Sequence, residues 1–192
     1  CSDVGANNEM LTVTDANRNT STATAVVTIA DIASPTAIAQ NITVNLDASG
    51  NATIVAADVN NGSSDNCGPV TLAIDVSTFT CTDIGVNNVI LTVTDANSNT
   101  STSTAVVTVA DIASPTAIAQ NITVNLDASG NATIVAADVN HGSSDNCGPV
   151  TLAIDVSTFT CSDVGANNVI LTVTDATSNP FTINTIITTD DI

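Results

Sequence analysis

The chain has 192 residues, with 19 acidic side chains against a single Arg and no Lys, and its formal net charge is −18 at pH 7. This charge excludes a nucleic-acid-binding protein, whose affinity comes from Lys and Arg on phosphates, and it excludes an anionic membrane surface as a partner. Aromatic residues make up only 2%, so the predicted core consists of Val, Ile, Leu and Ala with a few Phe. Since Lys and Tyr are absent and there is one His, few side chains could transfer protons or attack a substrate, and we expect no enzyme.

An internal repeat of 80 residues organises the chain. Residues 35–60 recur without change at 115–140, and the longer stretches 35–99 and 115–179 differ at five positions. The repeat register predicts three parts: the C-terminal part of a truncated repeat at 1–34, a complete repeat at 35–114, and a complete repeat with a divergent last strand at 115–192. Because the chain begins with Cys rather than Met, we expect further residues upstream. No apolar run reaches the length that crosses a bilayer, so no direct membrane insertion is expected.

Apolar residues alternate with polar ones along each repeat, which predicts strands. In chain order, the strands expected in the first complete repeat are 42–46, 53–57, 72–76, 89–94 and 102–109. No segment has a sustained helical period. The predicted fold class is therefore all-β, with tandem immunoglobulin-like β-sandwich repeats of 80 residues. Short joints that contain Pro115 or its equivalent favour an arrangement as an extended rod.

The truncated repeat supplies only the last two strands of a sandwich. A lone two-stranded hairpin is marginally stable in water. We therefore expect the strands within residues 1–34 to pair with residues outside this sequence, either upstream or in a neighbouring subunit.

Cysteines recur with the repeat. Cys67 and Cys81 lie 14 positions apart, and Cys147 and Cys161 repeat that spacing. We predict a disulfide within each pair, which would stabilise the fold by about 3 kcal/mol in the chain-entropy model. Cys1 matches Cys81 in register and is predicted to lack an intrachain partner; a lipidated N-terminus and a free reactive thiol are the less favoured alternatives. Paired cysteines without a CxxC pattern indicate an oxidising, extracellular setting.

Three stretches carry a resemblance to a known family: DNCG at 65–68, VTDANSN at 93–99 and the closing Thr/Val-rich strand. The repeat resembles hyalin-repeat and related immunoglobulin-like modules. The wider stretch 77–102 is similar to tandem repeats of very large surface adhesins of gliding bacteria, which a dedicated outer-membrane system secretes. The resemblance implies an extracellular, cell-surface protein with a role in adhesion or gliding motility. One departure is that Arg18, Ser98 and Ser178 occupy the Gly position of the family's Asp-x-x-Gly-Asn turn.

The acidic residues are almost all Asp, and most follow predicted strands in loops beside Asn and Ser. Short oxygen ligands on loops are what Ca²⁺ uses, with six to eight oxygens per ion. The alternative is that Asp and Asn are good turn residues that hydrogen-bond their own backbone. For an individual Asp the turn interpretation is favoured. For the whole set it is weaker, because uncompensated negative charges repel one another unless cations gather.

Topology narrows the candidate metal ligands. In a rod the chain arrives at one pole of each domain and leaves from the other, so the joint, the loop after the second strand and the turn before the last strand meet at one pole. The predicted Ca²⁺ ligands are Asp31, Asp58 and Asp95 at one junction and Asp111, Asp138 and Asp175 at the next, with Asp65 and Asp145 as further candidates.

These observations predict a structural shaft of a secreted cell-surface adhesin or extracellular filament, held by disulfides and stiffened by Ca²⁺ at the junctions. Its expected partners are adjacent repeats of the same long chain, with lateral or end-to-end self-association as a further option. The alternative is a module that binds polysaccharide or another ligand. That alternative is disfavoured because only Phe79, Phe159 and Phe181 could form an aromatic platform. His141 replaces Asn61 of the sister repeat, which indicates a solvated surface position.

Overall fold

The computed structural model describes residues 2–191, and β-strands joined by turns make up most of this stretch. Helical structure within it is limited to α1 (Ala136–Val139) and the 3₁₀ turns η1 (Cys81–Asp83) and η2 (Cys161–Asp163). None of these described helices is long and apolar enough to cross a membrane. The predicted all-β class is confirmed.

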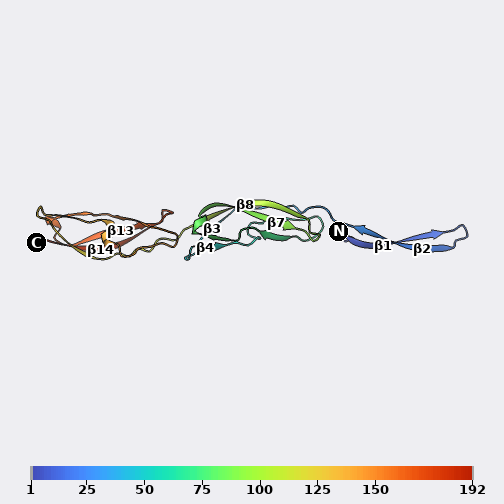
Figure 1. Ribbon diagram of the computed structural model, residues 1–192, viewed down its shortest axis with the longest axis horizontal. Helices are drawn as coiled ribbons and strands as arrows, with labels where there is room; N and C mark the ends of the chain where they lie inside the picture. Colours follow the sequence, from blue (N-terminus) through green and yellow to red (C-terminus); the bar gives the residue numbers. More distant parts are fainter. Residues whose placement is uncertain (1, 192) are drawn as a thin grey trace. The chain divides into compact units, whose positions relative to one another are not determined.

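The chain divides into two compact units. The first comprises Cys1–Ile42, Ile54–Ser77 and Asn88–Val107, and the second comprises Thr43–Thr53, Thr78–Asn87 and Thr108–Ile192. The long strands β7 (Gly85–Thr94) and β8 (Thr100–Ala110) each contribute residues to both units. They are neighbours in one sheet and lie side by side in Figure 1.

The C-terminal repeat lies within the second unit and forms an immunoglobulin-like β-sandwich. Its strands are β9 (Ile122–Asn125), β10 (Asn131–Thr133), β11 (Thr151–Ile154), β12 (Thr158–Thr160), β13 (Gly165–Thr174) and β14 (Pro180–Asp190). One sheet has the order β11-β13-β14-β9, and the other consists of β10 and β12. Strand β14 pairs antiparallel with β13 and parallel with β9. The divergent segment thus completes the sheet, with Pro180 at the first strand position, where no ladder hydrogen bond is lost.

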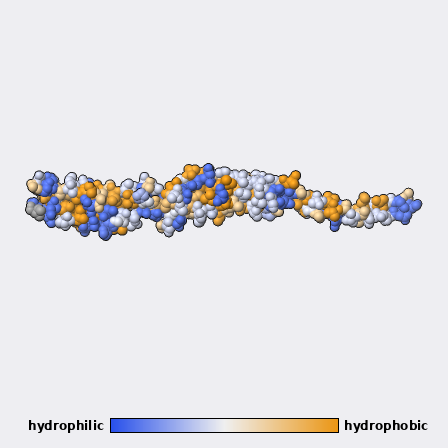
Figure 2. Space-filling model, viewed as in Figure 1, coloured by the Kyte–Doolittle hydropathy of each residue, from blue (hydrophilic) through white to orange (hydrophobic). Residues whose placement is uncertain are grey.

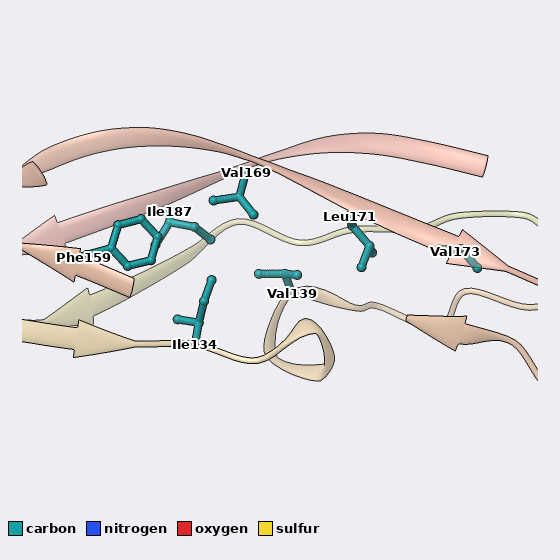
Figure 3. Close-up of a cluster of buried hydrophobic side chains, with 7 residues drawn as sticks. All are labelled: Ile134, Val139, Phe159, Val169, Leu171, Val173 and Ile187. Atoms are coloured by element: carbon teal, nitrogen blue, oxygen red, sulfur yellow. The ribbon is translucent and has the colours of Figure 1, made fainter. Parts of the chain in front are cut away.

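The core of this repeat lies between the two sheets. Alternate residues of β13 point to the same side of the strand, because successive side chains of a strand face opposite ways. Val169, Leu171 and Val173 are accordingly all fully buried. Figure 3 shows them with the rest of the cluster, which consists of Ile134, Val139, Phe159 and Ile187. Phe159 from β12 supplies the largest side chain, so this one aromatic residue does much of the filling.

The middle repeat has the same plan. Its remaining strands are β3 (Ile42–Asn45), β4 (Asn51–Thr53), β5 (Thr71–Ile74) and β6 (Thr78–Thr80), with sheet orders β3-β8-β7-β5 and β4-β6. Four of the five predicted strands are confirmed with shifted ends. The fifth, 53–57, is wrong because the strand ends at Thr53. The Asp58 carboxylate accepts a hydrogen bond from the backbone N–H of Val55 (2.7 Å), and the backbone N–H of Asp58 donates to the Val55 carbonyl (2.9 Å), so a turn forms there.

The first two strands, β1 (Gly5–Thr14) and β2 (Thr20–Ile29), form an antiparallel hairpin paired along its whole length. Leu11 is 64% exposed, whereas the equivalent Leu91 is fully buried. Figure 2 shows apolar side chains at the surface of this hairpin. Among the described residues β1 and β2 pair only with each other, and both faces are solvated. Their pairing with residues outside this sequence stays a prediction.

Candidate metal centres

The first cluster of carboxylates lies within the first unit. Asp31, Asp65 and Asp95 each contribute one oxygen, and these oxygens lie within 4.8 Å of one another. Asp95 follows β7 and organises the turn to β8: its Oδ1 accepts from the backbone N–H of Asn97 (2.9 Å) and of Asn99 (2.8 Å). The Asn99 amide donates to Asp95 Oδ2 (2.8 Å) and to the Asp31 carbonyl (3.2 Å). One asparagine thus holds the joint next to the turn.

The second cluster repeats this arrangement within the second unit. It consists of Asp111, Asp145 and Asp175, again with one oxygen from each within 4.8 Å of the others. Asp175 Oδ1 accepts from the backbone N–H of Asn179 (2.7 Å), and the Asn179 side chain donates to the Asp111 carbonyl (3.3 Å). Asp111 Oδ1 accepts from the Ala113 N–H (3.1 Å), and Asp145 Oδ2 accepts from the Cys147 N–H (2.8 Å).

The turns that carry Asp95 and Asp175 contain a residue in the left-handed region. Ser98 has a φ of 71°, Ser178 has 75°, and Arg18 has 71° in the equivalent hairpin turn. These three residues stand where the turn of the modules that the repeat resembles has Gly. The left-handed geometry explains why Gly is favoured there, since a side chain crowds the backbone at positive φ.

Several carboxylate oxygens in the clusters are buried without a hydrogen-bond partner. They are Asp31 Oδ2, Asp111 Oδ2 and Asp145 Oδ1. The Asp111 side chain is only 6% exposed. A buried, unpartnered carboxylate oxygen is costly unless a cation or another donor meets it. The only Arg of the chain is Arg18, and there is no Lys, so protein side chains offer little compensating charge.

The pKa values of Asp95 and Asp175 both lie below the ordinary carboxylate value. Burial, the largest single influence on each, raises the pKa, but the hydrogen bonds that each carboxylate accepts together outweigh it. For Asp95 the donors are Asn99, Asn97 and Ser98; for Asp175 they are Asn179 and Thr177. Both side chains are therefore ionised at neutral pH, which a ligand of a hard cation must be.

Six of the eight predicted metal ligands come together in these two clusters, and two do not. Asp58 and Asp138 are exposed, and each accepts a hydrogen bond from a backbone N–H three residues earlier, so they close turns. They lie outside both clusters, because the second strand of each repeat ends earlier than predicted, at Thr53 and at Thr133. The third carboxylate of each cluster comes from Asp65 or Asp145. Ser64 pairs with Thr36, and Ser144 pairs with Thr116, which holds the DNCG loop beside the joint.

The predicted disulfides within each repeat are also wrong. Cys81 is bonded to Cys147, with 5.1 Å between their Cα atoms and 66 positions between them in sequence. Cys161 is free and exposed, and Cys67 is disulfide-bonded. The prediction for Cys1 lies outside the described residues. In sequence, β5 and β6 separate Cys67 from Cys81, so the spacing of 14 did not indicate spatial proximity.

The bridge joins the 3₁₀ turn η1 of the middle repeat to the DNCG loop of the C-terminal repeat, within the second unit. The sulfur of Cys81 lies 3.7 Å from the carbonyl oxygen of Gly50 and 3.5 Å from that of Asn146. The Asn146 side chain donates to the Asp47 carbonyl (3.1 Å). The turn before β4 and the DNCG loop therefore meet around the disulfide.

The exposure of the Phe side chains and of His141 shows which of them could contact a ligand. Phe79 and Phe159 are core residues, 1% and 2% exposed, so neither can serve as an aromatic platform for a sugar. Phe181 is 46% exposed. His141 is exposed, as its exchange with Asn61 indicates.

The chain is similar to solved structures but not to curated sequences. No family model matches the chain, and no curated protein matches it in sequence. Among solved structures it is similar to a titin fragment of domains I67–I69 (TM-score 0.45, 8% identity, 96% of this chain and 75% of that one). It is also similar to human protocadherin-24 EC1-2 (TM-score 0.42, 11% identity, 83% of this chain and 99% of that one). A third similar structure is the protocadherin gammaB7 EC3-6 cis-dimer structure (TM-score 0.39, 14% identity, 97% of this chain and 58% of that one). This chain thus spans less than two thirds of the protocadherin gammaB7 chain. Similarity at this level supports no conclusion about ligands or activity.

Proposed function

We propose that this chain is a structural segment of an extracellular protein, in which Ca²⁺ binds at each junction between sequence repeats and a disulfide covalently joins consecutive repeats. The observation that carries the proposal is the second carboxylate cluster. It combines three Asp within 4.8 Å of one another with buried, unpartnered oxygens on two of them, Asp111 and Asp145. The three charges repel one another, and a divalent cation would relieve that repulsion.

The donor set suits Ca²⁺ better than a softer metal. Each cluster offers carboxylate oxygens, and neither includes His or Cys. Oxygen ligands select Ca²⁺ or Mg²⁺ over Zn²⁺ and Cu²⁺. Three carboxylates fill only part of the coordination shell of Ca²⁺, so water would complete it. The ion would tie the joint residue Asp111 to two loops of the following repeat, which is how we infer that Ca²⁺ stiffens the shaft.

An extracellular role as a shaft for adhesion accounts for the remaining features. The Cys81–Cys147 bridge fits an oxidising compartment. The high negative charge and the scarcity of exposed aromatic residues fit a spacer better than a ligand-binding tip. The near-identity of the two complete repeats fits an array whose units perform the same mechanical task.

The test is calcium binding by the full chain, measured by isothermal calorimetry after chelation. We expect two ions per chain, one for each cluster, and a rise in melting temperature with Ca²⁺, because a ligand that binds only the folded state stabilises it. Asp111→Asn keeps an oxygen for the Ala113 N–H but removes the charge. It should reduce the stoichiometry to one without lowering the melting temperature of the metal-free chain.

The matched control is Asp138→Asn, which removes the same charge from an exposed turn outside the cluster. It should leave the stoichiometry at two. If millimolar Ca²⁺ produces neither a binding isotherm nor a change in melting temperature, the calcium proposal is wrong and the carboxylates serve only as turn residues. Small-angle scattering with Ca²⁺ and with chelator tests the stiffening separately, since an unchanged maximum dimension would contradict it even where binding is seen.

A further inference from the structure

Two turns of identical sequence lie beside Cys81 and beside Cys161. Residues 46–51 and 126–131 both read LDASGN. In the first, the Asp47 N–H donates to the Asn51 carbonyl (2.8 Å) and the Gly50 N–H donates to the Asp47 carbonyl (2.9 Å). In the second, the equivalent bonds from Asp127 and Gly130 are both 2.8 Å. The two turns therefore have the same hydrogen-bonded structure.

The first turn is occupied by the DNCG loop of the next repeat. Asn146 donates to the Asp47 carbonyl, the Asn146 carbonyl lies beside the Cys81 sulfur, and Cys147 closes the disulfide. Gly50 makes room for the Cys81 sulfur, because a Cβ at Gly50 would lie 2.5 Å from it. The same Cβ position lies 3.4 Å from the Cys147 sulfur and 3.5 Å from the Asn146 carbonyl oxygen, so the loop is in van der Waals contact with this face of the turn.

The second turn presents the same surface without that loop. Cys161 is exposed and free, and its sulfur lies 3.8 Å from the Gly130 carbonyl, as that of Cys81 lies 3.7 Å from the Gly50 carbonyl. A Cβ at Gly130 would meet the Cys161 sulfur at 2.5 Å and nothing else within 4 Å. The surroundings of the cysteine are thus formed in advance, with space for a loop on the outer side of the turn.

We propose that Cys161 and the turn Asp127–Asn131 form a docking site for the Asp-Asn-Cys-Gly loop of a further repeat of this kind, closed by a disulfide to Cys161. The lone thiol alone would not identify a partner. The identification comes from Cys81, which stands in the same setting and is bonded to such a loop. The asparagine of the incoming loop would donate to the Asp127 carbonyl, as Asn146 donates to that of Asp47.

The bond forms by thiol–disulfide exchange when the loop cysteine arrives as a mixed disulfide with a small thiol such as glutathione. The Cys161 thiolate attacks the loop sulfur, the new protein–loop S–S bond forms, and the loop–glutathione bond breaks. Glutathione leaves as a thiolate and takes up the proton that Cys161 released. No additional oxidant is consumed in this step.

The experiment uses the full chain and a synthetic peptide with the sequence of residues 143–150, supplied as its mixed disulfide with glutathione. After equilibration and acid quenching, mass spectrometry with peptide mapping measures the ratio of peptide to glutathione on Cys161. We expect this ratio to be at least tenfold higher than for a peptide of the same composition in permuted order. A loop peptide with Ala at the Asn146 position should lose about threefold or more, because it lacks the amide that reaches the Asp127 carbonyl.

A protein variant tests the receiving surface. Gly130→Ala displaces the Cys161 sulfur, because the added methyl group would lie 2.5 Å from it. The preference for the loop peptide should then fall to that for the permuted peptide, even where glutathione still reacts with the displaced thiol. The peptide with Ala at the Asn146 position leaves the protein unchanged and so does not depend on how Gly130→Ala folds. If the loop and permuted peptides partition equally on the unmodified chain, the docking proposal is wrong and Cys161 is an ordinary exposed thiol.

Discussion

Asp111 and Asp175 place carboxylate oxygens within 4.8 Å of each other although they belong to different sequence repeats. Both side chains are buried, 6% and 5% exposed. Hydrogen bonds from the turn to the joint fix this proximity, because the Asn179 amide (3.3 Å) and the Thr177 hydroxyl (3.4 Å) both donate to the Asp111 carbonyl. The joint and the turn therefore carry the carboxylates and also make the hydrogen bonds that hold them close together.

The Cys81–Cys147 bridge should contribute strongly to stability. The bond closes a loop with a sequence separation of 66 residues, and the chain-entropy model gives about 4 kcal/mol for a loop of this length. The double variant Cys81→Ser/Cys147→Ser should lose about that much free energy of unfolding in urea titrations followed by circular dichroism. Cys161→Ser is the control and should change the unfolding free energy by less than about 0.5 kcal/mol. Equal unfolding midpoints for all three chains would contradict this prediction.

Replacing the left-handed Ser178 by Gly should stabilise the C-terminal repeat. The left-handed conformation destabilises a residue that has a side chain by about 1–2 kcal/mol. Glycine avoids this cost but lowers the free energy of unfolding by about 0.5–1 kcal/mol, because its unfolded chain has greater conformational freedom. Ser178→Gly should therefore raise the unfolding free energy by about 0.5 kcal/mol. Ser129→Gly is the matched control, because the φ of Ser129 is not positive, and it should be neutral or destabilising. Thermal melts that rank the two variants the other way would contradict the strain argument.

The exposed hairpin and the buried sheet offer a pair of equivalent leucines. Leu171 is fully buried in the core, whereas Leu11 is 64% exposed. Leu171→Ala should cost about 2–5 kcal/mol because it leaves a cavity, and Leu11→Ala should cost less than about 0.5 kcal/mol. Hydrogen exchange should agree, with amides of β1 and β2 exchanging much faster than those of β13. Comparable protection in the two regions would show that the hairpin is covered in solution.

The turn of the hairpin gives a pH-dependent signal outside the metal clusters. The Asn19 side chain and backbone, and the Asn17 backbone, donate to Asp15 and hold its pKa below the ordinary value of 3.8. A carboxylate with a lowered folded-state pKa stabilises the turn above its unfolded pKa, and this contribution disappears as the pH falls through the folded pKa. Carboxyl ¹³C titration by NMR should give Asp15 a midpoint below 3.8. Asn19→Ala should raise that midpoint, and Asn17→Ala should leave it unchanged because only its backbone donates.

The strands were predictable from sequence because the alternation of residues such as Val89, Leu91 and Val93 is a local signal of burial on one face. The turn at Asp58 was missed because its residues are also β-branched or small, and the side-chain bond that ends the strand has no periodic signature. The sequence predicted only some members of each carboxylate cluster. The expected topology placed Asp31 and Asp95 at the same pole. The position of Asp65 depends on the backbone pairing of Ser64 with Thr36, which has no signature in the sequence.

The disulfide shows a different limit of sequence reasoning. A spacing of 14 is compatible with a closed loop, and in a near-perfect repeat the pairing within a repeat and the pairing between repeats leave the same pattern of cysteines. Only the approach of Asn146 to Asp47 distinguishes them, since it brings Cys147 to Cys81. Long-range contacts between copies of a repeat are the class of contact that a repeated sequence cannot resolve.

Asp145 and Cys147 stand two residues apart in one loop, and the Cys147 N–H donates to the Asp145 carboxylate. The cation proposed at Asp145 and the covalent bond at Cys147 would therefore order the same short stretch of backbone. Whichever forms first removes the conformational entropy that the second would otherwise have to overcome. By thermodynamic reciprocity, reduction of the disulfide should weaken calcium affinity by the same factor by which calcium makes the disulfide harder to reduce. The loop would then respond jointly to the calcium level and the redox potential of its surroundings.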